Sequence, residues 1–412
     1  MAAQLRIPIA LATLLATGLF LFACKRGEPT ELRFSGLDPA HVRVIWTESP
    51  QSEALIAWST AEVGSEHRVY FDREPHNGRL DEYAESRPTT RDGIFTRTTR
   101  TDAEQPTVHY HHLELEGLAP STTYWLVVAS DRHVSREFHF TTAPDDDRPF
   151  RLLSGSDSRS RPDRRRTMNR LIADQVEKSD AIVAFLHGGD YVYHGHEIAE
   201  MAQWLSDWEM TIPQSGRLLP IVPTRGNHEG SSVVYDEAFG WPGDGQSYFA
   251  TDLGPNLGLV TLNTESAAEG DQLEFLRTTL GTMQTKAFRI AQYHQALYPA
   301  VKKPHPAREV WVPEFERQRL DLAMESDGHA LKRTVPILED KQDDKGVVYI
   351  GEGGYGVNQR ATRSHWYLEE PGFAASQIHL WQLTVTPERL TMEAFNEQGE
   401  TLDRGERATR GS

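Results

Sequence analysis

Short apolar runs alternate with polar turns through the first third of the chain. The runs are rich in β-branched and aromatic residues, and Gly, Pro, Asn and Asp separate them, which is the pattern of an all-β domain. They cover residues 42–46, 54–58, 67–71, 109–115, 124–129 and 137–141. Runs at this spacing predict a β-sandwich over residues 31–143. Residues 144–149, which hold three aspartates between two prolines, are typical of a linker.

From residue 150 onward the pattern changes to apolar strands that alternate with helical periods. This change predicts an α/β domain over residues 150–400. Helices are expected from an N-cap at Asp163 to residue 178, and over residues 197–210 and 271–280, because apolar positions there share one helical face. Residues 378–395 alternate like strands, and the polar residues 401–412 are expected to be disordered.

Apolar segments of the α/β domain end in side chains of the kinds that bind metals. These side chains are Asp157, Asp190, Asn227, His294, Asp327 and His329. Because the carboxyl ends of strands line one edge of an α/β sheet, we expect these ends to converge on one crevice. Oxygen and imidazole donors without thiolates suit Fe, Mn, Mg or Zn. The set is too large for one ion, and two ions that share a bridging carboxylate would use it fully.

The N-terminus has the pattern of a targeting segment. Arg6 is the one charged residue before an uncharged stretch over residues 7–23, and the only cysteine of the chain, Cys24, follows directly. Residues 1–23 resemble a bacterial lipoprotein signal that is cleaved before a lipid-bearing Cys24, with residues 24–30 as a tether; an uncleaved anchor is the alternative. Both place the folded part outside the cytoplasmic membrane. Lys25 favours periplasmic attachment to the outer rather than the inner membrane.

The net charge and the placement of the histidines argue against nucleic-acid binding and against a metal site in the first domain. The formal net charge of -17 argues against a nucleic-acid-binding surface, and it means that affinity for phosphate anions has to come from locally bound cations. His109 and His111 share one face of an expected strand and are conceivable as a metal pair. A strand-surface role is favoured, because no carboxylate or third ligand accompanies them in the sequence. The sequence does not settle the oligomeric state.

The order of motifs resembles the calcineurin-like metallophosphoesterases, and more closely the purple acid phosphatases, over residues 31–400. The motifs are Asp157-Ser-Arg, Gly-Asp190-Tyr-Val-Tyr193, Gly-Asn227-His228-Glu229, the lone His294, and Asp327-Gly-His329. Residues 117–124, Gly-Leu-Ala-Pro-Ser-Thr-Thr-Tyr, resemble fibronectin type III-like domains, in which the tyrosine packs at a corner between strands. The resemblance implies a two-domain fold: an all-β fibronectin type III-like sandwich, then a four-layer α/β/β/α metallophosphoesterase domain.

The resemblance also implies a role for each motif residue. Asp190 would bridge two metal ions, an iron with a second iron, manganese or zinc, with magnesium as a further candidate. The other ligands would be Asp157, Tyr193 and His329 at the first ion and Asn227, His294 and Asp327 at the second. A hydroxide on the metals would attack phosphorus. His228 would give a proton or hydrogen bond to the leaving-group oxygen, and Glu229 would fix the orientation of His228.

Two positions depart from the family pattern. Asp327 stands where a histidine is usual, and its carboxylate weakens the attraction for a phosphate dianion and shifts preference from zinc towards manganese, iron or magnesium. Arg159 stands where relatives have a metal-binding His or a Gly. It is interpreted either as a clamp on substrate phosphate or as a structural residue. The expected activity is acid-phosphatase-like hydrolysis of phosphomonoesters. The alternatives are a phosphodiesterase or nucleotidase, and a catalytically degenerate surface-binding lipoprotein.

Overall fold

The computed structural model describes residues 33–97, 104–241 and 246–410. The expected signal segment, Cys24 and the tether lie outside these residues. Within them, no helix is both long enough and apolar enough to cross a membrane.

The first domain is all β, as predicted. Each predicted run is a strand: β1 (Ala40–Ile45), β2 (Ala54–Thr60), β3 (His67–Asp72), β6 (His109–Leu115), β7 (Thr123–Ser130) and β9 (Phe138–Thr141). The pattern missed the short strands β4 (Glu85–Pro88), β5 (Arg91–Ile94) and β8 (His133–Val134). One sheet has the order β4-β3-β7-β8 with β9 on β7, and β1, β2, β6 and β5 form the other side. The Tyr124 hydroxyl accepts a hydrogen bond from the Ala119 amide at 2.9 Å, so this tyrosine does fix a corner.

The second domain has two sheets packed face to face between helices. The strands of its first sheet are β10 (Phe150–Gly155), β11 (Ile182–His187), β12 (Ile221–Pro223), β22 (Leu380–Val385), β23 (Arg389–Phe395) and β24 (Thr401–Ala408). Those of its second are β13 (Phe249–Leu253), β14 (Leu257–Thr261), β15 (Phe288–Gln295), β16 (Leu322–Ser326), β20 (Val348–Gly351), β17 (Leu331–Arg333) and β21 (Phe373–Ala375), in that order. The small pair β18 (Ile337–Leu338) and β19 (Lys341–Gln342) stands apart.

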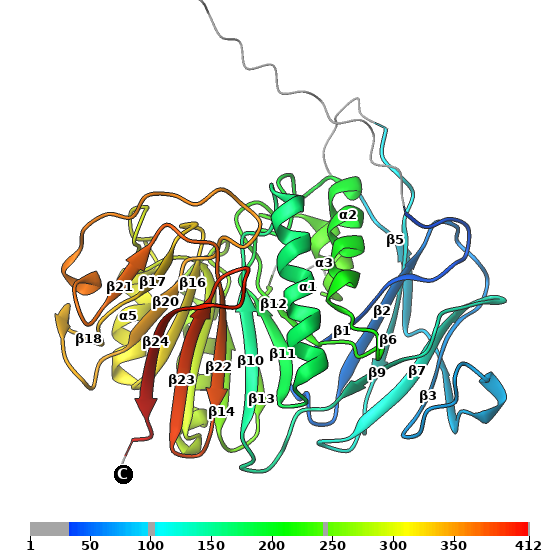
Figure 1. Cartoon of the computed structure of the whole chain (residues 1–412), viewed down its shortest axis with the longest axis horizontal. Helices are drawn as coiled ribbons and strands as arrows, with labels where there is room; N and C mark the ends of the chain where they lie inside the picture. The colour runs from blue at the N-terminus through cyan, green and yellow to red at the C-terminus, as the bar shows by residue number, and fades with distance from the viewer. Residues whose placement is uncertain (1–32, 98–103, 242–245, 411–412) are drawn as a thin grey trace, which may run out of the picture.

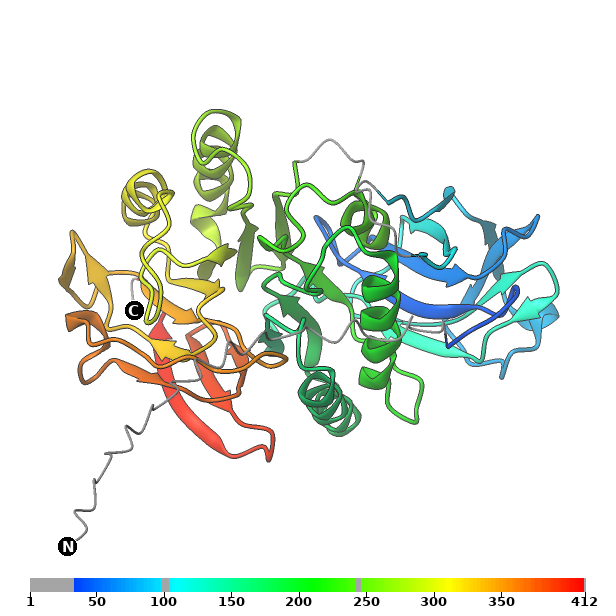
Figure 2. The same cartoon turned by 90° about the horizontal axis from the view of Figure 1, so that it is seen from above.

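Three helices cover the first sheet and two cover the second, which completes the α/β/β/α layers (Figures 1 and 2). They are α1 (Pro162–Lys178), α2 (Ile198–Trp208) and α3 (Val233–Phe239) on one side, and α4 (Asp271–Thr282) and α5 (Arg308–Arg317) on the other. The buried faces of the two sheets share one core, in which Leu186 of β11 and Ile290 of β15 are fully buried. The helical period predicted α1, α2 and α4 within a few residues, with Arg161 rather than Asp163 as the N-cap of α1. It missed α3 and α5.

The two domains share a continuous sheet. Strand β1 pairs in parallel with β12 at Ile45 and Ile221. The ten-stranded sheet therefore runs β24-β23-β22-β10-β11-β12-β1-β2-β6-β5, and in Figure 1 it extends from the red strands to the blue and cyan strands on the right. The change of pattern near residue 150 marks a boundary in the sequence, but the backbone ladder crosses between the domains.

The prediction of disorder after residue 400 is wrong. Residues Thr401–Ala408 form β24, which pairs antiparallel with β23 along its length and is the last strand of the sheet. An edge strand accepts many charged side chains because one of its sides faces water. Ion pairs add to the ladder: Arg333 contacts Asp403 at 2.7 Å, and Arg389 contacts Glu406 at 2.6 Å.

Candidate metal centre and active site

Four metal-binding side chains converge where the two sheets meet. Asp157 and Asp190 follow β10 and β11 of the first sheet, His294 lies near the end of β15, and Asp327 follows β16 of the second sheet. All four are buried, and their ligand atoms lie within 4.8 Å of one another. The convergence expected from the strand ends is therefore present, although it joins two sheets rather than one.

Left-handed backbone places three of these side chains, together with His329, at the ends of their strands. The φ angles are 55° at Asp157, 59° at Asp190, 68° at Asp327 and 61° at His329. A residue other than glycine in this region costs about 1 to 2 kcal/mol, and Asp and His are among those that tolerate it best. Backbone strain of this kind gathers at functional sites, where the surrounding structure holds it in place. Here the Asp157 amide donates to the Gly189 carbonyl at 3.0 Å.

The His294 imidazole is oriented for a ligand. Its Nδ1 donates to the Gly188 carbonyl at 2.8 Å, so Nε2 faces Asp190 Oδ1 at 3.2 Å and Asn227 Oδ1 at 3.1 Å. Burial alone would lower the pKa of His294, but the carboxylates of Asp190, Asp157 and Asp327 outweigh it and raise that pKa well above the usual range. The cluster therefore attracts positive charge strongly.

One oxygen of Asp157 has only an imidazole beside it. Its Oδ2 accepts hydrogen bonds from the Ser156 hydroxyl at 2.8 Å and the Asp327 amide at 3.0 Å. Its Oδ1 is buried, lies 3.2 Å from His329 Nε2, and accepts no hydrogen bond among the described residues. A buried carboxylate oxygen left in this way is costly unless a cation completes it.

His228 and Glu229 are placed differently from each other. The His228 amide donates to Asp190 Oδ1 at 3.0 Å, its Nδ1 donates to the Tyr193 carbonyl at 2.6 Å, and its Nε2 lies 3.8 Å from Asp190 Oδ2. Glu229 is buried and accepts hydrogen bonds from the amides of Asp190 and Tyr191 at 2.9 Å and of Gly226 at 3.0 Å. The expectation that Glu229 orients His228 directly is thus not what the geometry shows: a backbone carbonyl holds the ring, and Glu229 holds the turn that carries Asp190.

Arg159 reaches into the cluster. Its Nε donates to Asp190 Oδ2 at 3.0 Å and its Nη2 donates to His329 Nε2 at 3.2 Å, and only 7% of its side chain is exposed. Tyr193 lies outside it at the rim: the residue is 51% exposed, and its ring packs 5.1 Å from the His228 ring and 5.7 Å from the Arg159 guanidinium carbon. Of the expected ligands, Tyr193 is the one that the structure sets apart from the acidic group.

Sequence reasoning missed Lys302. Its ammonium group pairs with Asp327 Oδ1, and the Asp327 carbonyl accepts a hydrogen bond from Arg360 at 3.0 Å. Lys302 thus neutralises the carboxylate that stands at the usual histidine position. Lys302 and Lys303 follow β15 by several residues, and no periodicity or motif connects them to Asp327, some 25 residues further on.

Two family models match this chain, one per domain. Residues 39–142 match the purple acid phosphatase N-terminal domain, and residues 124–322 match the calcineurin-like phosphoesterase. The chain therefore carries a calcineurin-like metallophosphoesterase domain that follows a purple acid phosphatase N-terminal domain. Among solved structures, the purple acid phosphatase from yellow lupin (Lupinus luteus) seeds shares its fold with a TM-score of 0.73 and 18% identity, over 90% of this chain and 74% of that one.

The comparisons found further similar proteins at low sequence identity. The structure of PhoD aligns with a TM-score of 0.63 and 12% identity, over 92% of this chain and 94% of that one. Two proteins of Mycobacterium tuberculosis, the uncharacterized proteins Rv2577 and MT2654, are each 22% identical over 369 residues, which is 75% of this chain and 68% of theirs.

A metallophosphoesterase of this family implies a dinuclear metal centre. The carboxylates of Asp157, Asp190 and Asp327, the His294 imidazole and the Asn227 amide oxygen are a fitting donor set for one hard or borderline divalent cation. The open Asp157 Oδ1 supports that fit. The other half of the expected ligand set, around His329, fits less well because the Arg159 guanidinium already contacts it.

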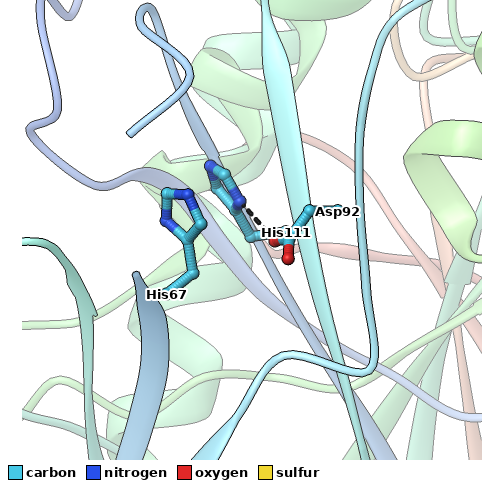
Figure 3. A group of neighbouring side chains, drawn as sticks. All are labelled: His67, Asp92 and His111. Carbon is cyan, nitrogen blue, oxygen red and sulfur yellow. Dashed lines mark hydrogen bonds and ion pairs between the residues drawn. The ribbon is translucent and has the colours of Figure 1, made fainter. Parts of the chain in front are cut away.

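The first domain of this metallophosphoesterase holds a second group, made of His67, Asp92 and His111 (Figure 3). The rings of His67 and His111 stack with centroids 3.6 Å apart, and His111 Nδ1 donates to Asp92 Oδ1 at 2.7 Å. His111 therefore does have a carboxylate and a second histidine beside it, which the sequence did not reveal, and it is buried rather than on the surface. All four ring nitrogens already have hydrogen-bond partners, so the group is satisfied as a structural clamp between strands.

Proposed function

We propose that this metallophosphoesterase hydrolyses phosphate monoesters at the cluster beside His228. The observation that carries the proposal is the convergence of the ligand atoms of Asp157, Asp190, His294 and Asp327 within 4.8 Å, with a histidine at its open side. A divalent cation held by these residues and Asn227 would draw charge from the phosphate oxygens and make a nearby water molecule more acidic. Manganese, iron, magnesium and zinc all suit the donors.

His228 is the residue proposed to move a proton. The Tyr193 carbonyl can only accept, so it fixes the hydrogen of His228 on Nδ1 and leaves Nε2 facing the cluster. A protonated Nε2 at the site can donate to the leaving-group oxygen as the ester bond to phosphorus breaks. The ring keeps this direction without help from Glu229, whose hydrogen bonds hold the turn at Asp190.

Arg159 and Lys302 supply positive charge to the site. The Nε and both Nη atoms of Arg159 contact Asp190, His329 and Ser160, so its proposed contribution is charge rather than a free fork for phosphate. Two cationic side chains beside the cluster favour a dianionic monoester. Because the three carboxylates still outnumber these two cations, hydrolysis of a diester, which carries less negative charge, is the second candidate. The presence of Asp190, Asn227 and His228 argues against a protein that only binds.

The first test compares 4-nitrophenyl phosphate with bis(4-nitrophenyl) phosphate in the presence of Mn²⁺. Asp190→Asn keeps the shape of the side chain and tolerates the left-handed backbone, but it removes the charge, so we expect it to abolish hydrolysis. Asp163→Asn is the matched control, because that carboxylate is exposed at the start of α1 and pairs with Arg161. Turnover by Asp190→Asn equal to that of the control would refute the proposed site, and a preference for the diester would select the second candidate.

The second test isolates the proton transfer. His228→Gln is expected to lower kcat by about 10²- to 10⁴-fold for alkyl phosphates, which are poor leaving groups, and by much less for 4-nitrophenyl phosphate, whose leaving group needs no proton. His194→Gln is the control: that histidine is exposed and pairs with Glu200 at 2.6 Å. An equal loss for both kinds of substrate would assign His228 to binding instead.

The cellular location is a separate part of the proposal and is supported by the sequence pattern around Cys24 alone. The chain is proposed to be a bacterial lipoprotein on the periplasmic face of the outer membrane. Incorporation of labelled palmitate into the wild type and its loss in Cys24→Ala would be expected. Equal labelling of both proteins would disprove the lipid anchor.

A further inference from the structure

The two oxygens of Asp190 face two different kinds of partner. Oδ1 lies 3.2 Å from His294 Nε2, on the side where Asn227 and Asp327 also lie. Oδ2 accepts a hydrogen bond from Arg159 Nε at 3.0 Å. A carboxylate at this position is expected to bridge two cations. In this chain one of its oxygens is already in contact with a cation that belongs to the protein.

The same guanidinium takes the lone pair of His329. Arginine has only donors, so the contact of 3.2 Å between Arg159 Nη2 and His329 Nε2 uses the nitrogen lone pair that would otherwise bind a metal. Arg159 thus contacts two of the residues expected to hold the first ion, Asp190 and His329, and His329 Nε2 in turn lies 3.2 Å from a third, at Asp157 Oδ1. The fourth, Tyr193, is at the rim with its ring 5.7 Å from the guanidinium carbon.

The positive charge of Arg159 excludes a metal ion from the position next to it. An arginine stays protonated at any pH at which the protein is folded, so it cannot become a ligand. A divalent ion beside it would bring three positive charges into contact in a buried place, where such repulsion is weakly screened. The guanidinium is buried and contacts three side chains. In the sequence, Arg159 occupies the position at which the family pattern has a histidine or a glycine.

We propose that the guanidinium of Arg159 replaces one of the two metal ions that the family implies, so that each chain holds a single divalent cation. That cation lies on the side of Asp190 Oδ1, within reach of His294 and Asp327. The inference rests on the metal-binding part of the proposed function, but the number of ions is measured independently of hydrolysis.

Charge supports a single ion. The three carboxylates of Asp157, Asp190 and Asp327 face the cationic side chains of Arg159 and Lys302, which leaves a formal charge of -1. One divalent ion brings the total to +1, enough to attract a phosphate anion. A second would bring it to +3 while Arg159 and Lys302 remain in contact with the same carboxylates.

The test counts Mn²⁺ ions. The full-length chain in detergent is stripped with a chelator, dialysed against Mn²⁺, and analysed by plasma mass spectrometry and electron paramagnetic resonance. The wild type is expected to bind one Mn²⁺ with the spectrum of an isolated ion. Arg159→His restores the ligand of the relatives and is expected to bind two, with the exchange-coupled spectrum of a close pair. Arg159→Gly, which removes the guanidinium without adding a ligand, serves as a second variant if the histidine disturbs folding.

Arg161→His is the matched control. Arg161 lies two residues further on, is partly exposed, and contacts Asp163 and Asn358 outside the cluster, so its replacement should leave one isolated Mn²⁺. Two ions in the wild type, none in the wild type, or one ion in both Arg159 variants would each overturn the inference. One ion per chain without hydrolysis would support the single-ion inference and refute the proposed function. Two ions per chain with hydrolysis would refute the single-ion inference and support the proposed function.

Discussion

Lys302 is the residue whose replacement tests the electrostatics of the site most directly. Its ammonium group pairs with Asp327, and it repels any cation that Asp327 helps to bind. Lys302→Met keeps the length of the side chain and removes the charge. We expect Mn²⁺ to bind more tightly to this variant, while the KM for a monoester rises because the substrate loses a positive neighbour.

The size of the effect follows from the geometry. The ammonium contacts Asp327 Oδ1, and an ion would lie about 2.2 Å beyond such an oxygen, so the two charges are about 5 Å apart. Because 42% of the Lys302 side chain is exposed, the dielectric constant of water is the appropriate limit. A +1 and a +2 charge then repel by about 1.7 kcal/mol, which is roughly a 15-fold change in Kd.

Isothermal titration with Mn²⁺ at low salt measures this change. Lys303→Met is the control, since Lys303 is also exposed and adjacent but is not paired with Asp327 in the described structure. The difference between the two variants should shrink in about 1 M salt, where screening acts within a few ångströms. An equal Kd for both variants, or weaker binding by Lys302→Met, would refute the reasoning.

Other changes test the fold around the site. Burial lowers the pKa of His41 from 6.5 to about 3, so the unfolded chain binds the extra proton and stability falls as the pH drops through this range. In His41→Asn, up to about 5 kcal/mol of that pH dependence should disappear from urea unfolding, and an unchanged pH profile would contradict this. Gly226→Ala should abolish Mn²⁺ binding because its Cβ would lie 2.3 Å from the Asp190 amide nitrogen, whereas Gly281→Ala in α4 meets no atom within 4 Å and should stabilise the protein by about 1 kcal/mol. Mn²⁺ binding by both glycine variants would show that the turn is not constrained. Tyr124→Phe removes the acceptor of a backbone amide and should lower the unfolding free energy by about 1 kcal/mol, and an unshifted urea midpoint would exclude a role for that bond.

Local patterns determined the elements and the ends of the strands. An apolar run of five or six residues followed by a turn residue defines a strand and its exit without any distant contact. For this reason β3, β6 and β7 were predicted close to their observed bounds. Asp157 and Asp190 were found in the same way, since the left-handed turns that present them are encoded by the residues next to them. The four residues that the structure brings together, Asp157, Asp190, His294 and Asp327, therefore needed only the order of short motifs.

Contacts between distant residues decided the rest. Arg159 meets His329 across 170 positions, and Lys302 meets Asp327 across 25; neither pairing leaves a periodic trace, because a long charged side chain can reach several partners. Strand β24 becomes ordered only because β23 offers a free edge, and β1 joins the second domain only where β12 lies beside it. The sequence thus determined which chemical groups stand at the ends of the strands. Only the tertiary structure decided that a cationic side chain of the protein itself, Arg159, contacts Asp190. That contact depends on where side chains from remote segments are packed.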